Sequence, residues 1–174
     1  MNWIERIARL EGWIIALCSL IVAAAFSMVV FVRYVLGGDL FAYEEIVLPV
    51  AFVLYFIGAA RASHDDMHIK ADLVVEGLKN PRARKAYQIF IFCVEGLIAG
   101  IFAYLGLKMF IAEFAKYPSM ARTSVYSIPL AAPRFFIFVG FSLMALHSFA
   151  HAYRHYLIFR SGQVAQLKSE RGSS

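Results

Sequence analysis

Residues 12–32, GWIIALCSLIVAAAFSMVVFV, decide the fold because no charged side chain interrupts them. At 1.5 Å of rise per residue, a helix of this length extends ~31 Å, which matches the ~30 Å hydrocarbon core of a bilayer. A cleaved signal peptide is the alternative, since the three alanines at 23–25 resemble a cleavage site. The preceding segment is mixed in charge and the run exceeds a signal peptide's apolar core, so we predict a retained transmembrane helix.

Three further apolar runs follow along the chain. The second is short, and it reaches spanning length if its helix starts near Phe41 and leaves Glu44 and Glu45 among the lipid headgroups. The third carries one carboxylate, Glu95, and Pro133 ahead of the fourth suits the first turn of a helix. We therefore predict an all-α integral membrane protein of four transmembrane helices, at about 12–33, 42–61, 86–107 and 133–154.

The composition supports this class. Hydrophobic residues make up 61% of the chain and charged residues 17%, and the mean hydropathy is +0.66. A soluble domain carries about 25% charged residues. Four spans use most of the 174 residues, so we predict one membrane domain over 1–160 and a cytoplasmic tail over 161–174. Nothing resembles a phosphate loop, a nucleophile with its base or a cysteine metal motif, so the sequence predicts no enzyme, catalytic residue, cofactor or metal.

The positions of the basic residues behind the net charge of +5 indicate how the chain is oriented in the membrane. In a soluble domain this excess could indicate nucleic acid, but here the Lys and Arg residues lie between the apolar runs. Twelve of the 17 fall on the side that holds both chain ends, which is the cytoplasmic side under the positive-inside rule. We predict a multi-pass protein of a bacterial inner membrane, with both termini in the cytoplasm, the lipid bilayer as a partner and no nucleic acid.

Two segments outside the spans have apolar residues at helical spacing. Residues 3–14 are expected to form a short amphipathic helix in the membrane plane before the first crossing. Residues 68–79 are the second candidate, with Pro81 just beyond their end. The predicted fold therefore includes short interfacial helices.

Glu95 lies about nine residues, or ~14 Å, inside the third span. A charge at this depth costs ~2.5–3.5 kcal/mol, so the carboxylate should be neutralised, paired or turned toward a partner. A proton or ion relay is the alternative. Because the sequence offers no matching set of polar residues, we favour a polar anchor that bonds to another helix or subunit. Gly96 and Gly100, and Gly58 with the two alanines after it, are typical of closely packed helices.

The histidines form two groups with a spacing of four residues, which puts each group on one helical face: His64 and His68, then His147, His151 and His155. This spacing suits haem or metal ligation. A haem-binding membrane anchor of an oxidoreductase therefore stays open as an alternative. Haem needs facing histidines at matched depth, however, and the first group lies in a polar connection.

Four short motifs carry a family resemblance: FVRY at 31–34, AYEE at 42–45, GAARA at 58–62 and HIKADL at 68–73. In this order and spacing they resemble the small (Q-type, DctQ-like) membrane subunit of tripartite ATP-independent periplasmic (TRAP) transporters. The overall length and the four-helix layout agree with the family. Beyond about residue 85 the resemblance rests on this layout alone.

The resemblance implies a division of labour among three proteins. A large membrane subunit carries the substrate and sodium sites and moves the substrate across the bilayer. A periplasmic substrate-binding protein delivers the substrate, an organic acid. The small subunit is non-catalytic, braces the large one and helps dock the binding protein. An autonomous small transporter is the other alternative, but it would need more polar residues within its spans than Glu95.

The family-like residues receive structural roles. Glu44 and Glu45 would favour the positive N-terminal end of the second helix, and Arg33 could pair with one of them. His68 and Asp72 are four residues apart and would share one face of a cytoplasmic helix. The candidate interface or structural residues are Arg33, Glu44, Glu45, Gly58, His68, Asp72, Glu95, Gly96 and Gly100.

Overall fold

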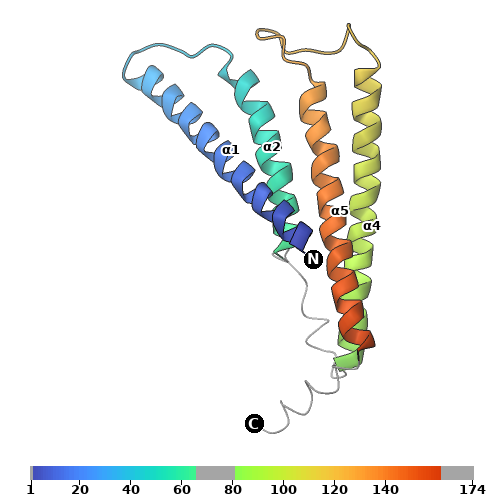
Figure 1. Cartoon of the computed structure of the whole chain (residues 1–174). Coiled ribbons are helices and arrows are strands. Elements are labelled where there is room, and N and C mark those ends of the chain that lie inside the picture. The colour runs from blue at the N-terminus through green and yellow to red at the C-terminus, as the bar shows by residue number, and fades with distance from the viewer. Residues whose placement is uncertain (1, 66–80, 162–174) are drawn as a thin grey trace.

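The computed structural model describes residues 2–65 and 81–161, and its regular elements there are four long helices (Figure 1). The helices are α1 (Asn2–Tyr34), α2 (Tyr43–His64), α4 (Pro81–Phe114) and α5 (Ala131–Arg160). Each is long and apolar enough to cross a membrane. The predicted all-α, four-span class is confirmed, and the chain is a multi-pass membrane protein.

The helices lie in the spatial order α1, α2, α5, α4. α4 and α5 run antiparallel and pack along most of their length, while α2 packs on α5 and α1 contacts α2 (Figure 1). α1 meets α2 near the start of α1 and diverges from it toward the connection at 35–42. The start of α1 and the end of α5 point to the same end of the bundle, as four crossings require. We call this the lower end, as drawn in Figure 1, and the opposite one the upper end.

α1 is a single helix of 33 residues. The separate in-plane helix expected over residues 3–14 is not formed, because these residues continue directly into the first span. Gly12, the one glycine in this stretch, does not interrupt the helix, and the neighbouring Ala8 and Glu11 are buried. The second candidate, residues 68–79, lies outside the described residues.

α1 ends where the chain enters a left-handed turn. Gly37 has φ 63°, a conformation that glycine adopts without steric cost, and the Gly38 N–H donates to the Val32 carbonyl at 3.2 Å. α2 begins after Ala42, which also has positive φ. α4, with 34 residues, would extend ~51 Å, more than the hydrocarbon core, so its ends project beyond the lipid tails.

Three glycines let the helices approach closely. A Cβ built on Gly140 of α5 would lie 2.6 Å from Phe56 Cβ and 2.9 Å from Phe56 O on α2. A Cβ on Gly106 of α4 would lie 3.2 Å from the backbone of Phe138 on α5. A Cβ on Gly96 would lie 3.0 Å from the ring of Phe149 on α5. Gly96 is one of the packing glycines expected from the sequence, whereas Gly106 and Gly140 were not among them.

The other two expected packing glycines are open. A Cβ on Gly58 or on Gly100 would meet nothing within 4 Å. The two glycines of the Gly96–Gly100 pair therefore differ: Gly96 supports the contact with α5, whereas the space next to Gly100 is open.

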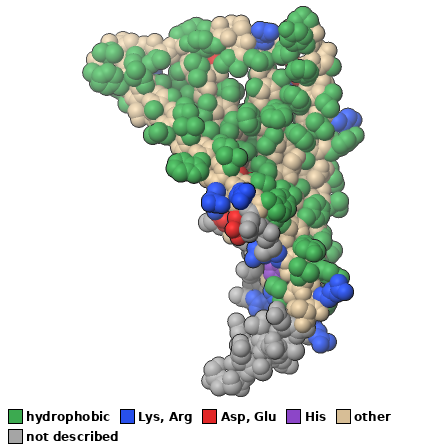
Figure 2. Space-filling view, viewed as in Figure 1, with side chains coloured by type: hydrophobic (Ala, Val, Ile, Leu, Met, Phe, Trp, Pro, Cys, Tyr) green, Lys and Arg blue, Asp and Glu red, His purple; other side chains and the backbone are tan. Residues whose placement is uncertain are grey.

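The outer surface of the bundle is apolar. Figure 2 shows hydrophobic side chains covering most of one face, with Lys and Arg side chains gathered toward the lower end. In α1, 6% of the residues in the most apolar stretch are buried, against 22% to 28% in the other three helices. α1 thus has the largest share of apolar surface without a partner in this chain.

Candidate functional site: polar clusters at the two ends of the bundle

Polar side chains gather in two places among the described residues. The lower cluster joins α1, α2, α4 and α5, and we define it by its members: Ala8, Glu11, Arg61, Ser63, His64, Asp65, Glu95, His147, Ser148 and His151. The upper cluster joins α2, α4, α5 and the connection between α4 and α5: Glu45, Glu113, Lys116, Ala121, Val125, Tyr126 and Arg134.

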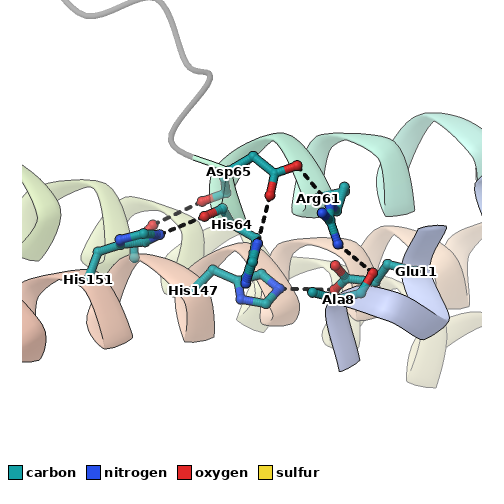
Figure 3. Close-up of polar contacts among 9 residues, drawn as sticks. Ala8, Glu11, Arg61, His64, Asp65, His147 and His151 are labelled. Atoms are coloured by element: carbon teal, nitrogen blue, oxygen red, sulfur yellow. Dashed lines mark hydrogen bonds and ion pairs between the residues drawn. The ribbon is translucent and has the colours of Figure 1, made fainter. Parts of the chain in front are cut away.

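The centre of the lower cluster is a buried pair between α1 and α5 (Figure 3). His147 Nε2 lies 3.0 Å from Glu11 Oε1, and the two side chains are 0% and 2% exposed. A carboxylate only accepts, so with Glu11 ionised the histidine donates this hydrogen bond. Removing a charge from water costs several kcal/mol, which only close pairing offsets. The pair therefore specifies where the start of α1 sits against α5.

A second contact ties α1 to α2. Arg61 Nη1 donates to the carbonyl oxygen of Ala8 at 2.6 Å, and Arg61 Nε donates to Asp65 Oδ2 at 2.8 Å (Figure 3). Asp65 directly follows α2, and His64 Nδ1 lies 2.8 Å from its other oxygen. Desolvation would raise the pKa of Asp65, but the hydrogen bonds from His64 and Arg61 outweigh it and lower that pKa below its usual value. Asp65 therefore stays ionised and holds Arg61 in place.

The other histidines hold α2 against α5. His151 Nε2 donates to the backbone carbonyl of His64 at 2.8 Å (Figure 3). The rings of His64 and His147 meet edge to face, with centroids 5.0 Å apart. Phe92 of α4 stacks on His151 and on His155, at 5.2 and 5.3 Å. In residues 2–65 and 81–161, no group of three His, Cys, Asp or Glu side chains is arranged to hold a metal ion.

Glu95 lies beside the end of α2. Ser63 Oγ donates to Glu95 Oε1 at 3.4 Å and lies 3.3 Å from Ser148 Oγ on α5. Ser63 and Ser148 are 3% and 1% exposed. One buried hydroxyl on α2 thus connects the carboxylate of α4 with the hydroxyl of α5.

Glu113 organises the upper cluster. Its side chain is 4% exposed and forms an ion pair with Arg134 of α5. The Ala121 N–H donates to Glu113 Oε1 at 2.8 Å, and Lys116 Nζ lies 3.3 Å from Glu113 Oε2. This one carboxylate therefore joins the last turn of α4 to the first turn of α5 and to the connection between them.

Glu45 fixes the same connection to α2. Its carboxylate accepts the backbone N–H groups of Val125 at 3.0 Å and Tyr126 at 2.9 Å. The connection is itself folded back, with the Thr123 N–H donating to the Ile128 carbonyl at 3.0 Å. Two carboxylates from different helices thus hold one loop.

The remaining predicted residues do not join these clusters. Arg33 and Glu44 are exposed, and within the described chain no ion pair connects Arg33 with Glu44 or Glu45. Gly58 and Gly100 are open. His68 and Asp72, together with the face they were expected to share, lie outside the described residues.

Sequence reasoning missed several members. Glu11 ends the charged segment before the first apolar run, within the residues 3–14 that were expected to form the in-plane helix. Its partner on α5 is 136 residues away in the sequence. Glu113 and Arg134 fell outside predicted spans 86–107 and 133–154 or at their edge. The signal that could have predicted their contact was a pair of opposite charges, one near the end of the third span and one near the start of the fourth.

These features define a class of protein: a helical membrane protein with four spans, whose polar residues tie its own helices together at both ends. The family model for tripartite ATP-independent periplasmic transporters, DctQ component, matches residues 21–157. The match covers most of the chain, so the chain belongs to the DctQ family and is a small membrane component of a TRAP transporter. No curated protein sequence matches the chain. The family assignment confirms the resemblance inferred from the four sequence motifs.

Proposed function

We propose that this chain is the non-catalytic subunit that braces the large membrane subunit of a TRAP transporter, and that the outer face of α1 makes the contact. The observation that carries the proposal is the state of α1, which is the most apolar of the four helices and has only 6% of its apolar stretch buried. Such a helix is either covered by lipid or packed against another protein.

The attachment of α1 supports a protein partner. Its polar contacts with the rest of the chain lie at the lower end, where Arg61 holds Ala8 and His147 holds Glu11. Farther along, exposed apolar residues face outward, among them Leu17 at 60% and Leu20 at 67%. A helix surrounded only by lipid would not need buried polar contacts to fix its direction, and such contacts are costly to form. A helix that presents a surface to a protein partner does need a fixed direction.

The use of the polar residues favours a brace over an autonomous transporter. Glu11, Glu95 and Glu113 each contact a neighbouring helix of the same chain. A transport pathway would need such groups to line a route across the bilayer. Here they gather in clusters that join helices, so the proposal leaves substrate and cation handling, with sodium as the expected ion and an organic acid as the expected cargo, to the large subunit.

The upper connection is our proposed contact for the periplasmic substrate-binding protein. Glu45 and Glu113 hold it, while Lys116 is 62% exposed and Tyr117 is 69% exposed. A cationic, aromatic surface on a fixed loop suits recognition of an acidic partner surface. This role places the upper end in the periplasm and both termini in the cytoplasm.

Site-specific photo-crosslinking in cells that express the whole transporter tests the brace. A photoreactive residue at Leu17 or Leu20 of α1 is expected to form an adduct with the large subunit. The matched control positions are Leu97 and Ile101 of α4, which are also exposed at 60% and 52%. Adducts from α4 but not from α1 would move the contact to α4.

A second measurement tests the function itself. Deletion of this chain is expected to abolish uptake and to reduce the amount of large subunit in the membrane. If uptake survives the deletion, or if this chain alone transports the substrate in liposomes, the brace is the wrong function.

A further inference from the structure

A small cleft at the lower end lies between the first turn of α1 and the last turns of α5. Its volume is about 120 Å³. The walls include Ile4 and Glu5 of α1, the end of α2 at His64, and Ala150 and Arg154 of α5, with buried His147 behind them. The cleft thus combines charged side chains with apolar ones at the end of a membrane-spanning bundle.

Two opposite charges in this cleft, Glu5 and Arg154, are exposed to solvent and have no partner among the described residues. Neither Glu5 nor Arg154 makes an ion pair or hydrogen bond with any residue in the described part of the chain, and the two do not pair with each other. In the adjacent lower cluster, by contrast, Arg61 is paired with Asp65 and His147 with Glu11. A ligand with a separate anionic and cationic group would satisfy both free charges.

A third polar group is already desolvated. His147 is 1% exposed, its Nε2 is used by Glu11, and its Nδ1 has no hydrogen-bond partner among the described residues. Buried ring nitrogens without a partner are costly, and this one belongs to a side chain that lines the cleft. As a neutral ring Nδ1 accepts from an N–H group, and as a protonated ring it donates to an oxygen anion.

The surroundings indicate where such a ligand comes from. Trp3, which precedes the lining residue Ile4 in the sequence, is 53% exposed, and Leu10 is 62% exposed two turns farther along the same helix. Tryptophan is enriched at the headgroup level of membranes, and basic side chains gather at this end of the molecule (Figure 2). A molecule lying here can put its polar part in the cleft and its apolar part along α1.

We propose that the cleft binds the zwitterionic headgroup of a phospholipid with a primary amine, of the phosphatidylethanolamine type. Arg154 binds the phosphodiester, because a guanidinium matches phosphate oxygens in geometry and charge. Glu5 binds the ammonium group. The Nδ1 of His147 accepts a hydrogen bond from the ammonium group when the ring is neutral and donates one to the phosphate when the ring is protonated. This site is independent of the brace, since it uses the lower end of the chain alone.

Native mass spectrometry of the full chain, purified free of lipid and then mixed with single lipids, tests the proposal. At equal acyl chains, phosphatidylethanolamine is expected to be retained at least about 5-fold more than phosphatidylglycerol, which has no ammonium group. Soluble phosphoethanolamine and inorganic phosphate are the other probes. If soluble phosphoethanolamine binds as well as the lipid, the lipid is overturned as the source of the headgroup.

Charge-removing variants distinguish the two halves of the site. Arg154→Gln is expected to lower retention of both lipids about 10-fold, and Arg154→Lys to lower it less. Glu5→Gln is expected to remove the preference for phosphatidylethanolamine without weakening phosphatidylglycerol. Arg160→Gln, on the exposed end of α5, is the matched control and should change neither. Equal retention of both lipids by the unmodified chain, or retention unchanged in Arg154→Gln, would overturn the proposal.

Discussion

At the level of single residues, the stability of the fold depends on Glu11 and His147 remaining paired. Both side chains are buried, so the loss of one leaves the other with no compensation for its lost hydration. Replacing both with apolar residues removes the two costs together, and such replacements are often neutral. The pair therefore predicts strong coupling between two positions that lie far apart in the sequence.

We expect His147→Leu to destabilise the protein by about 3–5 kcal/mol, because it leaves the Glu11 carboxylate buried and unpaired. The double variant Glu11→Leu/His147→Leu is expected to recover most of that loss. Thermal unfolding in detergent measures both. If the losses of stability in Glu11→Leu and in His147→Leu simply add in the double variant, the two side chains do not interact as the structure has them.

Glu95 gives a second prediction at this scale. Its contact with Ser63 needs only an acceptor oxygen, which glutamine keeps and leucine lacks. If Glu95 is a hydrogen-bonding anchor, Glu95→Gln should keep most of the uptake activity and stability. Glu95→Leu should lose about 1–3 kcal/mol of stability, because it removes the carboxylate that accepts from the buried Ser63 hydroxyl and leaves that hydroxyl only Ser148. Equal loss of uptake in both variants would instead favour an ionised role.

At the level of elements, the helix contacts depend on particular glycines. Gly140→Ala puts a methyl group 2.6 Å from Phe56 Cβ and 2.9 Å from Phe56 O, so α2 and α5 must separate. We expect a destabilisation of about 1–3 kcal/mol, as for other overpacked cores. Gly100→Ala is the matched control: it meets nothing within 4 Å, and the higher helix propensity of alanine should leave stability unchanged or raise it by up to about 1 kcal/mol. Equal effects of the two variants would refute this account of the α2–α5 contact.

The connection between α4 and α5 depends on α2. Glu45→Gln keeps one acceptor oxygen and removes the charge that holds two backbone N–H groups, so amide hydrogen exchange at Val125 and Tyr126 should become faster. Glu44→Gln changes an exposed neighbour and is expected to leave exchange as it was. Unchanged exchange in Glu45→Gln would show that the loop is held by other contacts.

The sequence predicted the elements well and their polar contacts poorly, for a physical reason. The length of a hydrophobic run is a local property of the sequence, so the run at 12–32 is enough by itself to predict a membrane-spanning helix. The pairing of Glu11 with His147 depends on how α1 crosses α5, and no local pattern encodes that geometry. Likewise, Gly96 and Gly100 look equivalent by spacing, but only the direction of α4 relative to α5 makes one a contact and leaves the other open.

At the level of the whole molecule, α4, α5 and α2 form the packed body, and α1 leans away from it (Figure 1). The tilt of α1 is set at its lower end by two polar contacts, Arg61 with Ala8 and His147 with Glu11. Toward the upper end, the rings of Phe26 and Tyr43 meet edge to face at 6.5 Å, a weak contact by comparison. The direction of the most exposed apolar helix thus depends on a small polar region.

This dependence gives a prediction about shape. Replacing Arg61 with Met and His147 with Leu removes both lower contacts while keeping apolar bulk, so α1 should sample a wider range of angles. Spin labels at Leu20 of α1 and Ile101 of α4, in a chain whose two native cysteines are replaced, report the separation of the helices by electron–electron resonance. We expect one narrow distance distribution in the parent and a clearly broader one in the double variant.

Labels within the packed body separate this effect from general loosening. Tyr104 of α4 and Tyr153 of α5 are both 61% exposed. The distance between labels there should stay narrow in the same variant, because the close contacts at Gly96 and Gly106 hold α4 to α5 without Arg61 or His147. If this second distance broadens too, the two polar contacts support the whole bundle. If neither broadens, packing alone directs α1. Broadening confined to α1, together with weaker capture of the large subunit, would mean that the lower cluster directs the surface by which this small component braces its partner.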